Sequence, residues 1–240
     1  MNIVVHGTGR MAGAIAEALN TREDHFLTAT VGPEAPAWAS AVPHYFSLDD
    51  LTSLPALLID FTLPNGTMAA AKWCADNDVA LLSGVTGLSD EVINSLQLAA
   101  KKVPVLWSPN LSLGVNLLAA LSRQAAAVLG PGISVAIEDI HHKWKKDAPS
   151  GTALMLGQTV AEEIGDEVAL KYASIREGEE IGVHTVSFTM DGEQIDLVHR
   201  AHDRSIYALG ALSAGEWLIG QVPGMYSAAD WLADRLSASI

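Results

Sequence analysis

The chain has one cysteine, Cys74, among its 240 residues. A single cysteine excludes an intramolecular disulfide and any cysteine-rich metal site, and it is typical of a reducing compartment. The sequence also contains no uncharged apolar run of about 18 residues, and Met1–Gly7 lacks the basic region and long apolar stretch of a signal peptide. We therefore expect no membrane span and no signal peptide, and a location in the cytoplasm.

Basic residues are scarce, with 14 Lys and Arg against 28 Asp and Glu and a formal net charge of -14. Such a charge repels the phosphates of nucleic acids, so we expect no nucleic-acid partner. A chain of this length can form one large or two modest domains, each with a core that needs neither metals nor disulfides.

The first 107 residues alternate short apolar, β-branched runs with longer helical patterns, as in a parallel sheet wound with helices. Asn65 and Ser89 are suited to cap the second and third of these helices. The expected strands span 2–6, 26–31, 57–61, 79–83 and 103–107, and the expected helices span 11–20, 66–77 and 89–101. This half is predicted to be an α/β, doubly wound, Rossmann-type nucleotide domain.

The pattern changes after residue 110. A long helix at 114–129, a strand at 133–142 and a helix from Ser150 precede a hairpin around Asp191-Gly192, whose strands span 183–190 and 193–199. Two helices, at about 206–219 and 227–237, follow. We predict an α+β substrate-binding and oligomerisation domain at 112–216, with a mostly antiparallel open sheet. Residues 1–111 and 217–240 are predicted to form the dinucleotide-binding domain.

The segment Gly7-Thr8-Gly9-Arg10-Met11-Ala12 lies between the first expected strand and the first expected helix. Glycines in this position let backbone N–H groups approach a pyrophosphate, and the helix dipole favours negative charge there. A plain strand-to-helix turn is the alternative, but the position at the first strand–helix junction favours a dinucleotide cofactor. The second strand ends at Val31-Gly32-Pro33-Glu34 with no acid at its tip, so the choice between NADH and NADPH stays open.

Residues 141–146 reverse the local charge of this acidic chain, with two histidines and three lysines in six residues. If the strand ends near His142, Lys145 lies on a loop that folds back toward it. Ser150 would then cap a helix whose Gly151 and Thr152 N–H groups face outward, which suits a dianionic substrate. A solvated lysine loop is the alternative. We expect no metal, because adjacent histidines point to opposite faces of a strand.

The pattern His-His-x-x-Lys-x-Asp-x-Pro-Ser-Gly-Thr-Ala at 141–153 resembles the signature of the dihydrodipicolinate reductase family, enzymes of lysine and diaminopimelate biosynthesis. Other segments resemble that family in the same order along nearly the whole chain: Gly9–Met11, Asp60–Thr62, Gly84–Gly87, Ser108–Asn116, Arg176–Gly178, Gly182–His184, His199–Ala201 and Pro223–Tyr226. The chain departs from the family in a shorter first turn, in Ala12 and Val85, and in the missing acid after the second strand.

The resemblance implies NADH- or NADPH-dependent reduction of (2S,4S)-4-hydroxy-2,3,4,5-tetrahydrodipicolinate, a small cyclic dicarboxylate, to tetrahydrodipicolinate, with the hydride passing to ring C4. It implies that His141 is the general acid/base and Lys145 a second proton donor. By the same resemblance, His142 and the N–H groups of Gly151 and Thr152 hold the substrate carboxylates. Asp147 is expected to play a structural part beside the lysines.

On the cofactor side, the resemblance assigns three groups of residues: Gly7, Thr8, Gly9, Arg10 and Met11 to the pyrophosphate, Gly84, Val85 and Thr86 to the nicotinamide ribose, and Ser108, Pro109, Asn110 and Leu111 to the nicotinamide edge. Phe61 is left to the core, because an aromatic residue at a strand end is more often buried packing. The family also implies a homotetramer built by pairing the open sheets.

Two other classes of function stay open. The first is another Rossmann-fold dehydrogenase of a small anionic substrate. A semialdehyde dehydrogenase would need a reactive cysteine, and Cys74 is badly placed for that role. The second is a sensor that binds NAD(P) without catalysis, which substrate turnover would exclude.

Overall fold

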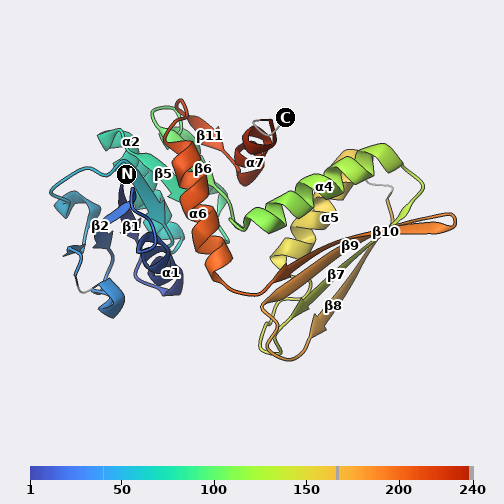
Figure 1. Cartoon of the computed structure of the whole chain (residues 1–240). Helices are drawn as coiled ribbons and strands as arrows, with labels where there is room; N and C mark the ends of the chain where they lie inside the picture. Colours follow the sequence, from blue (N-terminus) through green and yellow to red (C-terminus); the bar gives the residue numbers. More distant parts are fainter. Residues whose placement is uncertain (40, 166–167, 238–240) are drawn as a thin grey trace. The chain divides into compact units, whose positions relative to one another are not determined.

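The computed structural model of the chain describes residues 1–39, 41–165 and 168–237. The chain separates into two compact units (Figure 1). Unit 1 comprises Met1–Ser112 and Ser205–Ile240, and unit 2 comprises Leu113–Arg204. In these described ranges, no helix is both long enough and apolar enough to cross a membrane.

Unit 1 contains a parallel sheet. Among its described residues, seven strands pair in the order β11-β6-β5-β4-β1-β2-β3. All residues of β4 and β5 are buried, as expected for strands covered by helices on both faces. The strands are β1 (Asn2–His6), β2 (Phe26–Val31), β3 (His44–Tyr45), β4 (Leu57–Asp60), β5 (Ala80–Ser83), β6 (Pro104–Trp107) and β11 (Gly224–Tyr226). The doubly wound sheet predicted from the sequence is confirmed.

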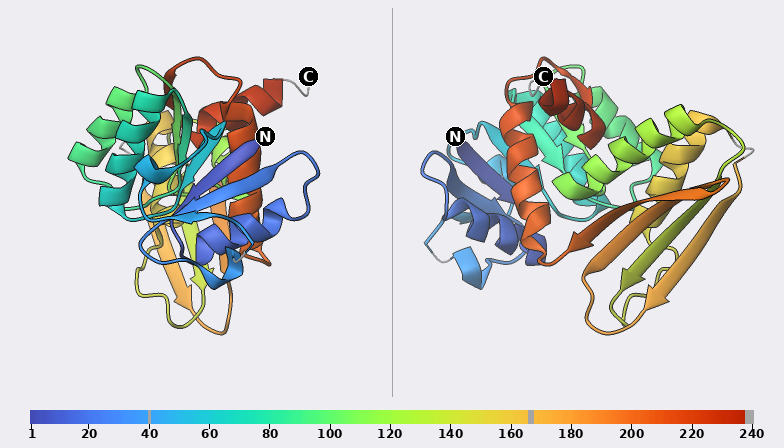
Figure 2. Two further views of the ribbon diagram at one scale, coloured as in Figure 1. Left: turned by 90° about the vertical axis from the view of Figure 1, so that its left-hand side faces the viewer. Right: turned by 45° about the vertical axis from the view of Figure 1, so that its right-hand side comes forward.

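Two cores lie on the two faces of this sheet, because successive side chains of a strand point to opposite sides. Ile3 and Val5 belong to a core with α1, α6 and α7, whereas Val4 belongs to a core with α2 and α3. Figure 2 shows these two helix layers on either side of the sheet. The helices are α1 (Arg10–Leu19), α2 (Pro64–Asn77), α3 (Asp90–Ala99), α6 (Ser205–Leu218) and α7 (Ala228–Ser237), with short 3-10 helices η1 (Ala37–Ala39) and η2 (Leu48–Asp50).

The start of α2 corrects one expectation. Asn65 lies inside the helix, and the cap position is held by Leu63, with Pro64 as the first helical residue. Proline favours this position because its φ is already helical and its missing N–H would have had no partner. Ser89 does occupy the cap position of α3, although its side chain makes no capping hydrogen bond.

The two units differ from the expected domains at the second boundary, which lies between residues 204 and 205 and not between 216 and 217. The difference is helix α6. Its buried residues Ala208, Ala211 and Leu212 pack in the core that contains α1 and β1. The helix therefore belongs to unit 1 from its first turn.

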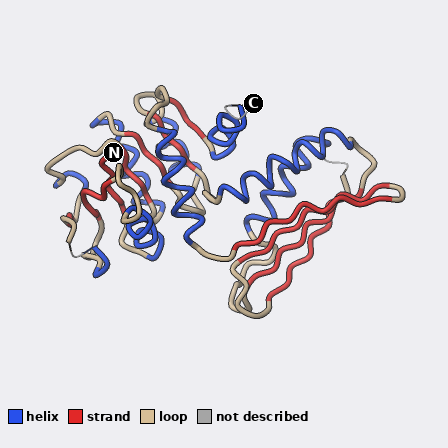
Figure 3. Tube along the Cα trace, in the orientation of Figure 1, coloured by secondary structure: helices blue, strands red, loops and turns tan. Residues whose placement is uncertain are grey.

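In unit 2, the helices lie on one face of the sheet (Figure 3). In the part that the structure describes, the strand order is β10-β9-β7-β8, with β7 and β8 parallel and the other pairs antiparallel. Its elements are α4 (Leu113–Leu129), β7 (Ser134–His141), α5 (Gly151–Ile164), β8 (Leu170–Arg176), β9 (Gly182–Met190) and β10 (Glu193–Ala201). The mostly antiparallel sheet is confirmed, while β8 is a strand that the sequence analysis did not identify.

The covered face of this sheet changes character along the strands. On β7 the buried positions run Val135, Ile137, Asp139 and His141, every second residue. On β9 the apolar Phe188 also gives way to a histidine, four residues earlier in the chain. The apolar core of unit 2 therefore ends in a row of ionisable side chains where β7 meets the loop before α5.

We expect Phe188→Ala to destabilise unit 2 by about 3–5 kcal/mol, because it leaves a cavity in the core. Phe188 is fully buried between the sheet and the helices. Chemical denaturation measures the free energy of unfolding. Val128→Ala on α4, where Val128 is 84% exposed, is the control and should stay within about 0.5 kcal/mol. Equal losses in the two variants would contradict this account of the core.

Candidate active site

The turn after β1 requires glycine at its first position. Gly7 has a φ of +117°, and its N–H donates to the Val31 carbonyl at 2.8 Å. A Cβ at Gly7 would lie 2.8 Å from the Phe61 carbonyl oxygen. Gly9 then caps α1, with nothing within 4 Å of a Cβ placed there, and in the described residues no side chain caps this helix start. The helix N-terminus is therefore open to an anion.

Two neighbouring cavities of about 290 and 310 Å³ lie next to this turn, and together we name them the glycine groove. They share Met11, Phe61, Gly84 and Thr86. The first adds Gly9, Arg10, Thr62, Leu63, Pro64 and Val85, and the second, which is mostly apolar, adds Ser108, Pro109, Leu111 and Tyr207. A glycine turn, an open helix start and an apolar cavity together fit a dinucleotide.

Of the twelve residues assigned to the cofactor from the sequence, nine line this groove: Gly9, Arg10, Met11, Gly84, Val85, Thr86, Ser108, Pro109 and Leu111. The other three shape its backbone. Gly7 makes the turn, and the Thr8 methyl fills the space that a side chain at Gly32 would need, 2.8 Å from a Cβ there. The Asn110 Oδ1 accepts the Ser112 N–H at 2.9 Å.

Phe61 packs against the core of unit 1, as the sequence favours. Its partly buried ring also lines both cavities. A Cβ at Gly84 would overlap this ring, so the glycine leaves room for the aromatic side chain.

A buried carboxylate, Asp60, connects the ends of neighbouring strands in the unit 1 sheet. Asp60, at the end of β4, is fully buried and accepts hydrogen bonds from the Thr62, Thr67 and Ser83 hydroxyls at 2.6, 2.7 and 3.0 Å. Its Oδ1 also lies 3.3 Å from the His6 Nδ1. Burial raises the pKa of Asp60, but the His6 ring and the threonine hydroxyls outweigh it and hold the pKa below its usual value. This carboxylate connects β1, β4, β5 and the first turns of α2.

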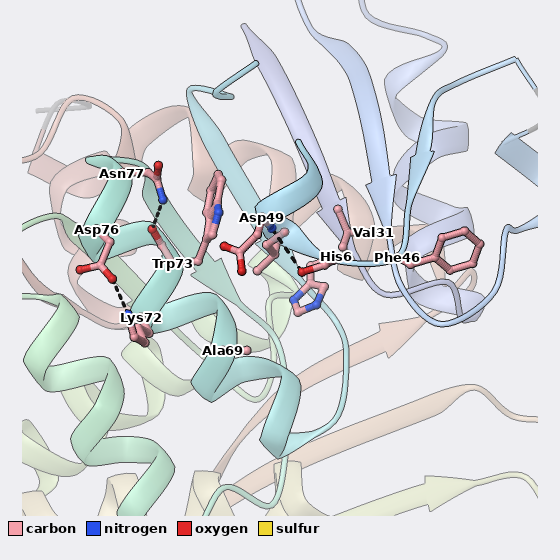
Figure 4. Close-up of a pocket in the computed structure, with 11 residues that line it drawn as sticks. His6, Val31, Phe46, Asp49, Ala69, Lys72, Trp73, Asp76 and Asn77 are labelled. Atoms are coloured by element: carbon pink, nitrogen blue, oxygen red, sulfur yellow. Dashed lines mark hydrogen bonds and ion pairs between the residues drawn. The ribbon is translucent and has the colours of Figure 1, made fainter. Parts of the chain in front are cut away.

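A further groove of about 350 Å³ lies between α2 and the segment around η2 (Figure 4). His6, Asp49 and Trp73 are among its lining residues, none of which lines the glycine groove. Its lysine, Lys72, is exposed and pairs with Asp76 at 2.6 Å. Because that charge is already neutralised, this groove is a weaker anion site than the glycine turn.

In unit 2, the residues expected to bind substrate lie on one strand, one loop and one helix start. His141 is the last residue of β7 and is buried, and the His142 N–H donates to the Glu180 carbonyl at 2.7 Å. In the loop that follows, the Lys145 N–H turns back to the His142 carbonyl at 3.1 Å. The Lys145 Nζ lies 2.8 Å from the Asp147 carboxylate, so Asp147 is its partner and not the helix cap.

The helix cap is Ser150, as the sequence predicts. Its Oγ accepts the Ala153 N–H at 3.1 Å. Gly151 and Thr152 are the first two residues of α5, at the positive end of the helix dipole. We name His141, His142, Lys145, Gly151 and Thr152 together the histidine site.

The sequence assigned no role to three further side chains of this region, which are Asp139 on β7, Arg176 on β8 and His184 on β9. The His184 ring contacts the His141 ring, with centroids 5.1 Å apart. Burial and the neighbouring His141 and His199 lower the pKa of His184 to about 4, so this ring is neutral at pH 7.

His141 has its own electrostatic setting. Burial lowers its pKa, and the positive charges of Lys145 and Arg176 lower it further, whereas Asp139 and Asp147 oppose that change. The net pKa lies below the usual histidine value. A protonated His141 is therefore a stronger acid than an exposed histidine.

In the described residues, no three or more His, Cys, Asp or Glu side chains are grouped so that they could hold a metal ion. Cys74 is buried in α2, and its burial raises the pKa of the thiol well above its ordinary value. The thiol is therefore a poor nucleophile.

Comparison with known proteins matches both halves of the chain to one family. Residues 1–111 match the model of the N-terminal part of dihydrodipicolinate reductase, and residues 114–232 match that of its C-terminal part. The chain belongs to the dihydrodipicolinate reductase family. The family resemblance seen in the sequence is thereby confirmed.

Relatives of this family match along almost their full length. A 4-hydroxy-tetrahydrodipicolinate reductase of Stenotrophomonas maltophilia (strain K279a) is 41% identical, with 97% of this chain and 98% of that protein covered. The protein of the same name from Anaeromyxobacter sp. (strain Fw109-5) is 38% identical, with 98% of both covered. Among solved structures, a dipicolinate-bound dihydrodipicolinate reductase from Paenisporosarcina sp. TG-14 has a TM-score of 0.83 at 23% identity, with 95% and 97% covered. That likeness shows the shared fold.

We expect Gly84→Ala to weaken NADH and NADPH binding, because the added methyl group pushes the Phe61 ring into the glycine groove. Quenching of tryptophan fluorescence on titration with each cofactor measures the dissociation constant. Gly220→Ala is the matched control, since a Cβ there makes only an ordinary contact, at 3.6 Å from the Trp217 carbonyl oxygen. Unchanged cofactor affinity in a normally folded Gly84→Ala protein would show that the cofactor lies elsewhere.

Proposed function

We propose that this protein reduces (2S,4S)-4-hydroxy-2,3,4,5-tetrahydrodipicolinate to tetrahydrodipicolinate, with His141 and Lys145 as the proton donors. The chain is an NAD(P)H-dependent oxidoreductase of lysine biosynthesis by the diaminopimelate route, as its family and its relatives indicate. The observation that carries the proposal is a buried histidine, a lysine and a helix N-terminus, whose dipole favours an anion, on one strand–loop–helix segment of such a chain.

The substrate is a small dicarboxylate, and the charges of the histidine site are suited to it. His142 and the first-turn N–H groups of Gly151 and Thr152 bind its carboxylates in our proposal, helped by the dipole of α5. These groups are fixed before the substrate arrives, since Ser150 caps the helix and the His142 backbone is bonded to the Glu180 carbonyl. Such preorganised polar groups stabilise developing charge without rearranging.

The reaction needs one hydride and one proton. Loss of water from the hydroxylated ring leaves a conjugated ring, and C4 of this ring would take the hydride that a bound NADH or NADPH would supply. Carbanion character then develops on the neighbouring ring carbon, and we assign the proton delivered there to His141. Because its pKa lies below the usual histidine value, the protonated ring is a stronger acid than an exposed histidine. Lys145, held by Asp147, stabilises the negative charge and is the second candidate donor of this one proton.

For the cofactor, we propose that Gly7, Thr8, Gly9, Arg10 and Met11 hold the pyrophosphate. Gly84, Val85 and Thr86 would hold the nicotinamide ribose, and Ser108, Pro109, Asn110 and Leu111 the nicotinamide edge. The open start of α1 and the mostly apolar second cavity support this order. We also propose that the protein acts in the cytoplasm, which its single buried cysteine supports.

We expect His141→Gln and Lys145→Ala each to lower kcat by about 10²–10⁴-fold, the usual contribution of a general acid. The assay follows the absorbance of NADH and of NADPH, with substrate made in situ from pyruvate and aspartate semialdehyde by a synthase. Lys143→Ala is the matched control, because Lys143 lies in the same loop with its Nζ 4.7 Å from the centre of the Trp144 ring.

The results separate the rival functions. Cofactor oxidation that depends on the cyclic substrate supports the proposal. Cofactor binding without turnover would favour a sensor, and turnover of a different small anion would favour another dehydrogenase.

We further propose a homotetramer in which the uncovered faces of the unit 2 sheets pair. Ala136, Ala173 and Val198 are exposed on the uncovered face of this sheet, which supports a contact there. Light scattering at micromolar concentration should give four times the 25.3 kDa mass of the chain. Val198→Lys should lower that mass, whereas Val128→Lys on α4 should not. A monomer in the wild-type protein would exclude the tetramer.

A further inference from the structure

A buried ion pair lies directly behind the histidine site. Asp139, on β7, is fully buried and points to the same face of the sheet as His141. Its Oδ1 accepts a hydrogen bond from the Arg176 Nη1 at 2.6 Å, and its Oδ2 lies 3.3 Å from the Arg176 Nη2. The Arg176 side chain, at the end of β8, is 15% exposed. The two groups form a fork-to-fork pair with little contact with water.

The Asp139 carboxylate reaches two parts of the histidine site. Its Oδ2 accepts the Ser150 N–H at 2.8 Å, so it holds the residue that caps α5 and positions Gly151. Its Oδ1 lies 3.7 Å from the His141 Nδ1. This distance is too long for a hydrogen bond, and the Nδ1 has no hydrogen-bond partner among the described residues, so the carboxylate acts on the ring through its charge.

Arg176 reaches the lysine loop from the other end of the pair. Its Nη2 donates to the Asp147 carbonyl at 2.7 Å, while the Asp147 carboxylate holds the Lys145 Nζ at 2.8 Å. The Arg176 guanidinium therefore holds the backbone of Asp147, and the Asp147 carboxylate holds Lys145. One ion pair is connected to both groups that we assign as proton donors and to the helix start that we assign to the substrate carboxylates.

Stability alone is a poor reason for this arrangement. Burying two charges costs solvation free energy, and an apolar pair of similar volume often stabilises a protein as well or better. In addition, the Arg176 Nε is buried without a hydrogen-bond acceptor among the described residues, which adds to the cost. Groups that break the packing rules in this way are expected near functional sites.

We propose that Asp139 and Arg176 are positioning residues for the reduction, holding His141, Lys145 and the start of α5 in one arrangement. The inference rests on the proposed function. Neither residue is assigned a contact with the substrate, so both act through their neighbours.

The two members of the pair act on the charge of His141 with opposite signs. The charged groups that affect His141 come from β7 (Asp139), β8 (Arg176) and the loop (Lys145 and Asp147), and β9 adds the neutral His184 ring. Asp139 favours the protonated ring and Arg176 disfavours it. Loss of the carboxylate charge therefore lowers the pKa of His141, and loss of the guanidinium charge raises it.

The experiment uses the full-length protein with Asp139→Asn, Arg176→Gln and Arg176→Lys. We expect kcat to fall by about 100-fold in each, the scale of a small misplacement of catalytic groups, with cofactor affinity unchanged. The limb of the pH–rate profile on which activity falls as His141 loses its proton should move to lower pH in Asp139→Asn and to higher pH in Arg176→Gln. Arg176→Lys keeps the positive charge but loses the paired hydrogen bonds to the Asp139 carboxylate. We therefore expect kcat to fall while the pH of this limb changes little.

An NMR titration of the His141 ring, assigned by its absence in His141→Gln, gives the same pKa shifts without turnover. Failure of the proposed function is thus distinguishable from failure of this inference. Arg123→Gln is the control, because it breaks an exposed ion pair with Glu162 on the same unit and should change nothing. His141 shifts of the same sign in Asp139→Asn and Arg176→Gln would overturn the proposal.

If Asp139→Asn does not fold, the apolar double variant Asp139→Leu/Arg176→Met replaces it, since apolar replacement of a buried pair preserves many folds. We expect it to fold and to bind NADH but to lose about 100-fold in kcat. A stable double variant with wild-type kcat would overturn the proposal.

Discussion

A buried carboxylate keeps its charge only if hydrogen-bond donors surround it, and both candidate sites are built on this constraint. In unit 1, Asp60 collects the Thr67 and Ser83 hydroxyls from the elements that border the glycine groove. In unit 2, Asp139 collects the Ser150 N–H and the Arg176 guanidinium from elements beside the histidine site. Each carboxylate therefore holds separate strand and helix ends at one point.

The period of a β-strand makes this possible. The residues of β7 that face α5 are apolar at Val135 and Ile137 and ionisable at Asp139 and His141. The same alternation that buries Val135 and Ile137 also places His141, the proposed proton donor, on the buried face at the end of β7. The loop that leads to α5 begins at this point. Because the packed core sets the position of His141, the site shares its rigidity, which is what preorganised acid catalysis requires.

Elements that are marked by their own residues, such as an apolar run or a turn sequence, could be predicted from the sequence. The apolar run Asn2–His6, ended by Gly7, was placed to the residue, and the Asp191-Gly192 turn marked the hairpin, with Gly192 at a φ of +84°. Strand β8 was not identified, and neither was β11 with its three residues, because their partners are distant in sequence and their own alternation is weak. Phe61 packs against the core and also lines the glycine groove, and a sequence cannot tell a ring that lines a cavity from one that fills a core.

The sequence by itself determined the family, the parallel and the mostly antiparallel sheets, and the segment around His141 and Lys145, because these depend on short-range order along the chain. The tertiary structure alone decided which distant groups complete the sites. Arg176 lies 37 residues from Asp139, and His184 reaches His141 only through the pairing of β9 with β7. Electrostatic interactions act through space and not along the chain, so the pKa of His141 depends on contacts that the order of the residues does not display.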